Sequence, residues 1–357
     1  MSDAGWDAAR ALVLRHGWNA TAYQILNPGM QRWFSAAGDA VAGYVTYAGV
    51  RVVAGAPVCS GGRLPDVARE LEDDAHAHGE QVLFFGAGAR LERLYGARDD
   101  HAMVRLGAQP VWDPHHWSAL VRGKASLRAQ LNRARNKGVR VDEWPPARAR
   151  DASALRGVLR VWLAGRGLPP LGFMVTPDLL GHTEDRRTFV ATREGDVVAF
   201  LVATPVPARG GWLVEQWPRA PLAPNGTTHL LVDAAMRAFA ADGVSYATLG
   251  LAPLSRHGAV ALARPEPLWL RLTLRWLRAH GRRFYNFAGL EAFKASLQPM
   301  GWEPVFAIAE GRRFTPPLLH AVAGAFSGGS PERLILRALF MAMRDELRSL
   351  RARRRGG

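Results

Sequence analysis

The segment RRTFVATREGDVVAFLVATPV, residues 186–206, contains two β-rich runs on either side of a turn at residues 194–196. A third strand-like run, GWLVEQWPR, occupies residues 211–219. A helical segment at 225–243 and a further strand-like run at 246–254 follow. This order of three strands, helix and strand predicts an α/β (α+β) lobe with a mostly antiparallel sheet.

The same order of elements occurs earlier in the chain. Residues 40–60, AVAGYVTYAGVRVVAGAPVCS, read as two or three antiparallel strands with turns at Gly49 and Gly55. A helix at 64–79 and a buried strand at 80–87 follow. We therefore expect two tandem lobes, with the chain divided into an N-terminal lobe at 1–119, a basic connecting helix at 120–150, a C-terminal lobe at 151–311 and a basic amphipathic tail at 312–357.

Positive charge is concentrated in two short parts of the chain. The 357 residues carry a net charge of +15, and residues 120–150 and 312–357 each carry +7, whereas residues 1–119 carry −3. This distribution favours a polyanionic partner such as nucleic acid or anionic lipid. The single cysteine, Cys59, excludes an intrachain disulfide and fits a reducing cytoplasm.

Several other classes of segment are not expected. The sequence has no run of 18 or more apolar residues, and no cluster with the spacing of zinc ligands. The first 20 residues read as a short helix and not as a signal peptide, because a signal peptide would have a positive stretch followed by a long apolar one.

Two amphipathic helices with arginine stripes are predicted near the C-terminal end. In residues 266–283 the stripe has helical spacing, and in residues 330–355 a second stripe follows a flexible FSGGS hinge. Such helices suit an anionic membrane surface, and the last one would equally suit nucleic acid. The residues expected to contact a membrane are Arg271, Arg275, Arg278, Arg282, Arg337, Arg344 and Arg348.

Four ordered segments together resemble one family. They are RAQLNRARNKGV at 128–139, LAPNGTTHLLVDAAM at 222–236, YATLGLAPLS at 246–255 and RFYNFAGLEAFKASLQPMGWEPV at 283–305. Their order and spacing resemble the C-terminal catalytic domain of bacterial phosphatidylglycerol lysyltransferases, the aminoacyl-phosphatidylglycerol synthases also called multiple peptide resistance factors. The resemblance covers roughly residues 20–310.

The resemblance implies a fold of two acetyltransferase-like (GNAT) lobes and an aminoacyltransferase that contributes to antimicrobial peptide resistance. The aminoacyl group would pass from aminoacyl-tRNA, as co-substrate, to a lipid hydroxyl such as that of phosphatidylglycerol. No cofactor or metal is implied, and the protein would lie peripherally on the cytoplasmic face of the membrane. Two departures from the family are expected: a stand-alone form without the membrane-spanning domain that often precedes the catalytic domain, and Glu215 and Arg219 near the positions where the family usually has an Asp followed closely by an Arg.

Candidate site residues follow from the chemistry of acyl transfer, which needs an ammonium-binding carboxylate and oxyanion stabilisation. Glu215, in an apolar strand, would bind the donor's ammonium group or form a structural ion pair with an arginine. Asn225, Gly226 and Thr227 would hold a phosphate at the start of a helix, or Asn225 or Thr227 would cap that helix. His229 reads as a packed or surface histidine rather than a base.

Lys294 is the one lysine outside the basic segment that holds Lys124 and Lys137. Helical phase places it near Leu290, on the inner face of its helix. It would bind the ester carbonyl, the developing oxyanion or a phosphate, or else pair with Glu291 or Glu303. The catalytic candidates are thus Lys294, Glu215 and Asn225, and the substrate-binding candidates are Arg219, Gly226, Thr227, Tyr285, Asn286, Glu291 and Glu303.

In the basic helix at 124–137, Leu127, Leu131 and Ala134 share one helical face and are expected to be its apolar face. The helix would contact the tRNA acceptor stem, or its charges would face solvent on a linker. Its candidate residues are Lys124, Arg128, Arg133, Arg135 and Lys137. Alternative functions are transfer to a soluble amine or peptide, acetyl-CoA N-acetyl transfer and a non-catalytic binding module. The acetyl-CoA reading is disfavoured because RAHGRR, at 278–283, is the nearest match to a pyrophosphate loop and fails at its last position.

Overall fold

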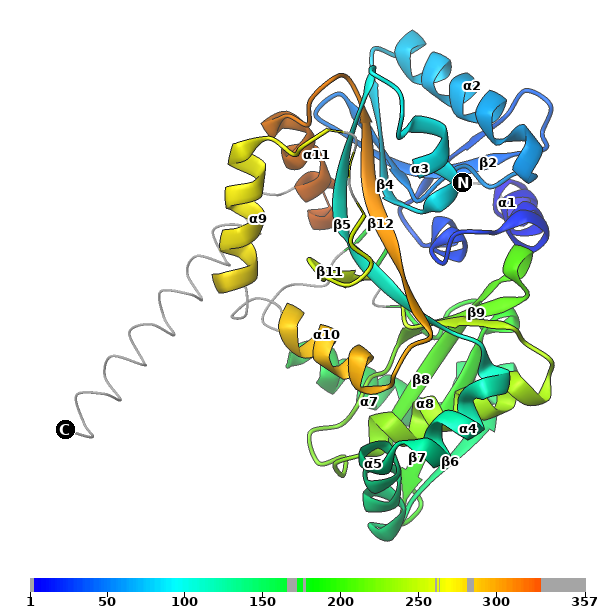
Figure 1. Ribbon diagram of the computed structural model, residues 1–357. Coiled ribbons are helices and arrows are strands. Elements are labelled where there is room, and N and C mark those ends of the chain that lie inside the picture. Colours follow the sequence, from blue (N-terminus) through cyan, green and yellow to red (C-terminus); the bar gives the residue numbers. More distant parts are fainter. Residues whose placement is uncertain are drawn as a thin grey trace.

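The computed structural model describes residues 3–165, 172–175, 178–260, 262, 264–280 and 286–328. The described chain is a mixed α/β protein (Figure 1). Its strands are β1 (Gln31–Phe34), β2 (Val41–Tyr47), β3 (Val50–Ala54), β4 (Gln81–Ala87), β5 (His101–Trp112), β6 (Val139–Trp144), β7 (Arg187–Arg193), β8 (Asp196–Val206), β9 (Gly211–Gln216), β10 (Tyr246–Thr248), β11 (Ala252–Pro253) and β12 (Gly301–Glu310).

The helices lie on both faces of these strands. They are α1 (Asp3–His16), α2 (Leu64–Ala77), α3 (Ala89–Tyr95), α4 (Trp117–Gly123), α5 (Ala125–Asn136), α6 (Pro146–Asp151), α7 (Ser153–Ala164), α8 (Thr227–Ala241), α9 (Leu268–His280), α10 (Phe287–Ser296) and α11 (Pro316–Ser327). A short 3₁₀ segment, η1 (Ala22–Leu26), joins α1 to β1.

The described strands form one continuous sheet in the order β1-β2-β3-β4-β12-β5-β10-β9-β8-β7-β6, with β11 paired to β5. Most neighbours are antiparallel, as the sequence predicts. The two exceptions match each other: β3 and β4 are parallel and connected through α2, and β9 and β10 are parallel and connected through α8. The predicted repeat of three strands, helix and strand is therefore confirmed at the level of topology.

The strands do not follow the predicted division of the chain into two separate lobes. β12 was assigned to the second lobe, but it lies between β4 and β5 and pairs with β5 from Gly301–Val111 to Glu310–His101. The end of β5, in turn, pairs with β10 of the second half. β5 and β12 are the two long strands that run through the molecule in Figure 1. The lobes thus share one sheet.

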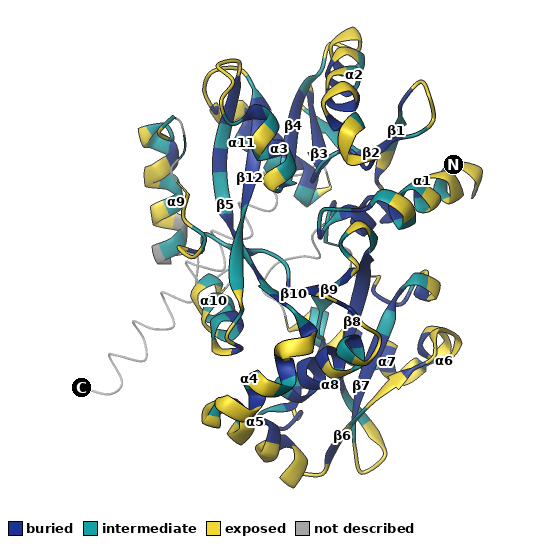
Figure 2. Ribbon diagram, turned by 45° about the vertical axis from the view of Figure 1, so that its right-hand side comes forward, coloured by how far each residue is buried: buried dark blue, intermediate teal, exposed yellow. Residues whose placement is uncertain are grey.

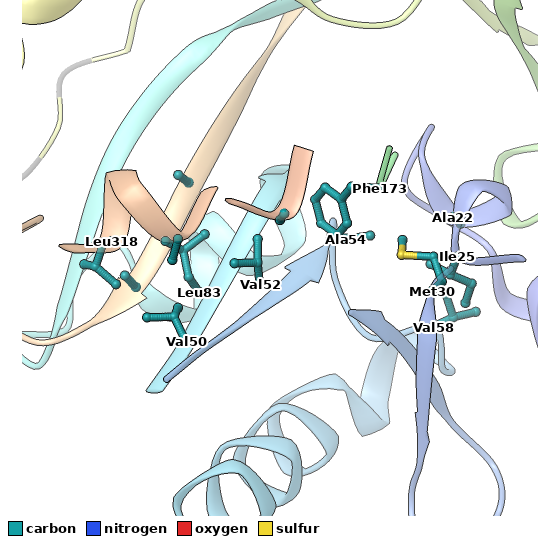
Figure 3. Packing of buried hydrophobic residues seen from close by; sticks show 14 of the residues in the cluster. Ala22, Ile25, Met30, Val50, Val52, Ala54, Val58, Leu83, Phe173 and Leu318 are labelled. Atoms are coloured by element: carbon teal, nitrogen blue, oxygen red, sulfur yellow. The ribbon is translucent and has the colours of Figure 1, made fainter. Parts of the chain in front are cut away.

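Apolar side chains cover both faces of the first half. One face packs against η1 and α11, and Figure 3 shows Leu318 of α11 beside Val50 and Leu83. The other face packs against α2 and α3 through residues such as Leu71 and Leu91. α11 was expected to belong to a basic tail, but its Leu318, Ala321 and Ala325 are buried in this core.

The second half buries its strands between two helical layers. α4, α5 and α8 cover one face, where the predicted apolar face of α5, Leu127, Leu131 and Ala134, is buried. α7 covers the other face through Leu155 and neighbours. The sheet and these helices hold the ends of β9 and β10, α10 and the start of α8 close together, where most of the candidate residues lie.

Candidate active site

Lys294 is buried inside the protein at the C-terminal part of α10. Its side chain is 2% exposed, and Nζ donates hydrogen bonds to the carbonyl oxygens of Gly250 and Leu251, each at 2.8 Å. Burial lowers the pKa of Lys294 from its usual 10.5 to about 7. The inner position predicted from helical phase is therefore confirmed, and near neutral pH this amine can hold or release a proton.

The predicted alternative, a pair of Lys294 with Glu291 or Glu303, is wrong because both carboxylates bind other groups. Glu291 accepts hydrogen bonds from Ser255 Oγ at 2.8 Å and from Arg278 Nη2 at 3.2 Å. Glu291 therefore braces α10 against its neighbours, and a direct contact with substrate remains a prediction.

Glu303 belongs to a separate polar group on β12. Arg209 donates to both of its carboxylate oxygens, at 2.5 and 2.8 Å, and Gln109 Nε2 donates at 2.9 Å. The Arg209 guanidinium also lies 3.6 Å from the centroid of the Tyr246 ring. These contacts hold Glu303 in place, and a direct contact of Glu303 with substrate remains a prediction.

Glu215 on β9 carries a buried carboxylate with no hydrogen bond to either oxygen among the described residues. Burial raises the pKa of Glu215, opposed by the nearby Arg186 guanidinium and the Gln24 side chain. Arg186 instead donates from Nη1 to the carbonyl oxygens of Leu179 and Gly181. Among the described residues, the structural ion pair considered from the sequence is thus not formed, and the carboxylate retains the capacity to accept hydrogen bonds.

Other buried polar atoms lack partners in the segment that packs against β8 and β9. Ala20 packs with Val206 and Leu213, which places residues 19–24 over these two strands. Within the described residues, hydrogen-bond partners are missing for Asn19 Nδ2, Thr21 Oγ1, Gln24 Oε1, Thr204 Oγ1 and Arg186 Nε. No sequence motif predicts these residues, because they come from three distant segments that only the fold brings together.

Lys294 and Glu215 are linked through the end of β9. A Cβ built on Gly250, whose carbonyl accepts from Lys294, would lie 3.1 Å from the Leu213 side chain. Leu213 and Glu215 are two positions apart on β9, and the pairing of β9 with β8 shifts register at Glu215. The two catalytic candidates therefore flank one contact between β9 and the loop after β10.

A cavity of about 410 Å³ opens at the start of α8, and we call it the Trp217 pocket. Aromatic rings form one wall: the Phe293 ring centroid lies 5.7 Å from that of Trp217 and 5.1 Å from that of His229. Phe293 precedes Lys294 on α10, so α10 sends one side chain to this pocket and the next into the interior. The pocket is lined by Gln130, Arg133, Trp162, Trp217, Arg219, Asn225, Gly226, Thr228, His229 and Phe293.

Three polar residues of the Trp217 pocket were predicted from the sequence, but their meeting in one cavity was not. Arg219 and Asn225 were predicted for the substrate, and Arg133 for tRNA, and the structure brings all three to one cavity. No carboxylate among the described residues pairs with Arg133 or Arg219, and both are exposed. Burial lowers the pKa of His229, which therefore lines the pocket as a neutral imidazole.

Gly226 and Thr227 have structural roles at the start of α8. Gly226 has φ +93°, and a Cβ there would collide with the Gln130 carbonyl oxygen of α5. Thr227 is fully buried, and its Oγ1 donates to the Pro224 carbonyl at 2.7 Å. Thr227 therefore cannot reach a substrate in this structure, and neither its hydroxyl nor Asn225 makes the side-chain cap that the sequence suggested.

Comparison with known proteins identifies the family of this chain. Residues 10–309 match the family described as phosphatidylglycerol lysyltransferase, C-terminal. The chain belongs to this family. A curated phosphatidylglycerol lysyltransferase of Bacillus subtilis is 26% identical over 271 residues, which is 75% of this chain and 31% of that protein. The chain thus spans about a third of the length of this relative.

Two solved structures share the fold. A C-terminal domain attributed to a lysylphosphatidylglycerol synthetase from Agrobacterium fabrum matches with a TM-score of 0.76 and 23% identity, covering 92% of this chain and 99% of that one. L-PGS from Bacillus licheniformis matches with a TM-score of 0.70 and 21% identity, covering 93% and 97%. Both likenesses extend over the shared sheet and both halves of this phosphatidylglycerol lysyltransferase-family chain.

In this family member, α5 presents fewer free charges than its sequence suggests. Arg135 pairs with Asp233 at 3.0 Å, and Arg128 Nη1 donates back to the carbonyl oxygens of Val121 and Arg122. Lys124 and Lys137 stand at the two ends of the helix. Arg133, on the side of the Trp217 pocket, is the arginine of α5 with no such partner among the described residues.

The arginine stripe of α9 splits in two directions. Arg271 and Arg275 are exposed, whereas Arg278 turns inward and donates to the Leu254 carbonyl and to Glu291. Asn286 caps α10 by accepting a hydrogen bond from the Gly289 N–H at 3.0 Å. The predicted residues Tyr285, Arg282, Arg337, Arg344 and Arg348 lie outside the described residues.

Two further expectations concern metals and membrane spans. Within the residues that the structure describes, no group of three or more His, Cys, Asp or Glu side chains is placed to hold a metal ion. Among the same residues, no helix is long and apolar enough to span a bilayer.

Proposed function

We propose that this protein transfers an aminoacyl group from aminoacyl-tRNA to the hydroxyl of a phospholipid such as phosphatidylglycerol. The observation that carries the proposal is the presence of two buried groups: the amine of Lys294, and the carboxylate of Glu215, which has no hydrogen-bond partner among the described residues. Membership of the phosphatidylglycerol lysyltransferase family supports this donor and acceptor.

Glu215 is suited to hold the ammonium group of the aminoacyl donor. The ammonium group would supply the hydrogen-bond donors that both carboxylate oxygens lack among the described residues, and a positive charge in addition to that of nearby Arg186. Binding a cation would also return the carboxylate to its charged form, which burial disfavours.

Lys294 is suited to stabilise negative charge that develops on the ester oxygen. In the reaction, the acceptor hydroxyl oxygen bonds to the ester carbonyl carbon, and the bond from that carbon to the tRNA ribose oxygen breaks. The hydroxyl proton ends on the ribose oxygen. A lysine held by the carbonyls of Gly250 and Leu251 is fixed in place, so its charge needs no reorganisation as the oxyanion forms.

The Trp217 pocket supplies groups for orientation and proton transfer. Arg133 and Arg219 can bind phosphate oxygens of the donor, and Asn225 can donate a hydrogen bond from its exposed amide. His229, neutral because burial lowers its pKa, is the group in this pocket suited to take the hydroxyl proton. Arg128, Lys124 and Lys137 would extend the contact along the acceptor stem.

The membrane supplies the second substrate, and α9 with its exposed Arg271 and Arg275 is expected to face it. The purified protein, labelled aminoacyl-tRNAs and a total lipid extract provide the test. Label in the organic phase that disappears after RNase pretreatment supports the proposal. Label confined to water-soluble products indicates a soluble amine or peptide acceptor, and transfer that requires acetyl-CoA rejects tRNA dependence.

A further inference from the structure

A second cavity, of about 690 Å³, lies beside the N-terminal end of α9, away from Lys294. Its walls come from the loop after α3, the start of β5, the segment leading into α9 and the residues after β12. We call it the arginine cavity, because its lining includes Arg98, Arg264, Arg312 and Arg313. It shares no residue with the Trp217 pocket.

The arginine cavity has more positive than negative charge. Arg98 pairs with Asp100 at 2.6 Å, and Arg264 pairs with Asp99. Glu266 is a further carboxylate in the lining, so four arginines face three carboxylates in and beside the cavity. Arg312 and Arg313 are exposed, and no carboxylate among the described residues pairs with either. Two arginines without an ion-pair partner that line one cavity suit a lipid phosphate group, whose oxygens accept hydrogen bonds from guanidinium groups.

α9 carries an exposed apolar row that begins at the mouth of this cavity. Leu268 lines the cavity and is 65% exposed, and Leu272 and Trp276 follow at intervals of four residues with 52% and 50% exposure. The row extends about 12 Å along the helix. Figure 2 shows α9 at the edge of the molecule with exposed residues along its length.

The opposite side of α9 anchors it to the fold. Leu270 is 1% exposed, and Trp269 and Leu274 pack on the first core. Arg271 and Arg275 lie along one edge of the exposed row. A helix with this arrangement, buried on one side and bearing apolar residues beside arginines on the other, suits the boundary between lipid headgroups and acyl chains.

We propose that the arginine cavity binds the phosphate headgroup of an anionic phospholipid that is not the acceptor, while the row Leu268, Leu272 and Trp276 enters the bilayer. A nucleic acid would satisfy the arginines but would leave the apolar row in water, and therefore fits less well. The proposal rests on the proposed function only in placing the acceptor in the same bilayer.

The contact of α9 with α10 gives this site a consequence for the reaction centre. Arg278, near the far end of α9, donates to Glu291 on the helix that carries Lys294. A lipid held at the arginine cavity would therefore fix the height of α10 relative to the membrane surface. The headgroup acts as an anchor, and the acceptor lipid enters elsewhere.

The test is co-flotation of the full chain with vesicles of phosphatidylcholine containing phosphatidic acid, which lacks the glycerol hydroxyl of the acceptor. No tRNA is added, so failure of the proposed transfer reaction does not affect the result. We expect the double variant Arg312→Ala/Arg313→Ala to bind about 30-fold more weakly, since each basic residue near an anionic surface contributes about five-fold. Leu272→Glu should abolish flotation.

The matched controls are Arg160→Ala and Val161→Glu, on the exposed side of α7. Both should float as the wild type does, and circular dichroism should show all variants folded. The double variant should still transfer label to short-chain phosphatidylglycerol that is dissolved as monomers. Equal binding of wild type and double variant to these vesicles, or binding to phosphatidylcholine alone, would overturn the proposal. A loss of tRNA binding with unchanged flotation would assign the cavity to nucleic acid instead.

Discussion

Arg278 Nη2 on α9 lies 3.2 Å from Glu291 Oε2 on α10, and this contact joins the outermost helix to the helix that holds Lys294. Glu291 also accepts from Ser255 in the segment after β11, so a single carboxylate connects three parts of the chain. The basic face of α9, the interior lysine and the Trp217 pocket are thereby held in one arrangement around α10.

Lys294→Met should lower turnover by at least about a hundred-fold, because it removes the cation available to the developing oxyanion. Its effect on folding should depend on pH. The pKa of Lys294 is lower in the folded state, so the unfolded chain binds the extra proton between about pH 7 and 10. Wild-type stability should therefore rise through this range by about 1.4 kcal/mol per pH unit, and the variant should lack that rise.

Urea unfolding from pH 6 to 10 measures this difference for Lys294. The slope of unfolding free energy against pH is the informative quantity. The absolute stability also changes, because Lys294→Met leaves the two carbonyl oxygens without a donor. A variant with full activity, or with the same slope as wild type, contradicts the assignment.

Glu215→Gln should increase stability while it abolishes transfer. The raised pKa of Glu215 means that the folded protein holds its proton longer than the unfolded chain, so wild-type stability falls as pH rises through that folded pKa. Removing the charge should raise the free energy of unfolding at pH 7 by about 1 kcal/mol or more. Donor binding should weaken with it, measured as KM for aminoacyl-tRNA.

Glu303→Gln is the matched control for Glu215, because that carboxylate is paired with Arg209. This variant should be destabilised instead, since it leaves a half-buried guanidinium without its partner. If both variants change stability in the same direction, the carboxylate of Glu215 has a partner in solution and the ammonium-binding role is unsupported.

Gly226→Ala should destabilise the protein more than Gly195→Ala does. Both glycines have φ +93°, but a Cβ at Gly226 meets the Gln130 carbonyl whereas nothing lies within 4 Å at Gly195. We expect about 1 kcal/mol for Gly195→Ala from backbone conformation alone, and about 3 kcal/mol for Gly226→Ala. Thermal unfolding of the two variants provides the comparison, and equal losses would contradict a close approach of α8 to α5.

Arg133→Ala and Arg219→Ala should each weaken tRNA binding and reduce the slope of log affinity against log salt by about 1. Each lines the Trp217 pocket without a carboxylate partner among the described residues. Arg140→Ala, on an exposed position of β6, is the control and should bind as wild type does. Filter binding at several salt concentrations measures both quantities, and unchanged slopes would place the acceptor stem elsewhere.

The periodicity of single helices predicts part of the candidate site, but not the contacts between distant segments. Helical phase placed Lys294 inward and the apolar face of α5 correctly, since both depend on the geometry of one helix. The acceptors of Lys294 are backbone carbonyls of a loop, which carry no residue signal. The inward turn of Arg278 depends on α10, and the convergence of Arg133 and Arg219 depends on packing of α5 against α8. Such contacts between distant segments have no periodicity in the sequence.

The position of β12 has a consequence for synthesis of the chain on the ribosome. Until residues 301–310 have left the exit tunnel, β4 and β5 have an empty strand position between them, and the first half cannot close its sheet. The nascent chain must therefore keep two strand edges apart while nearly 200 further residues are made, counted from Trp112 to Gly301. Such delayed pairing slows folding and exposes those edges to aggregation. This order of strands therefore favours a need for chaperones during synthesis.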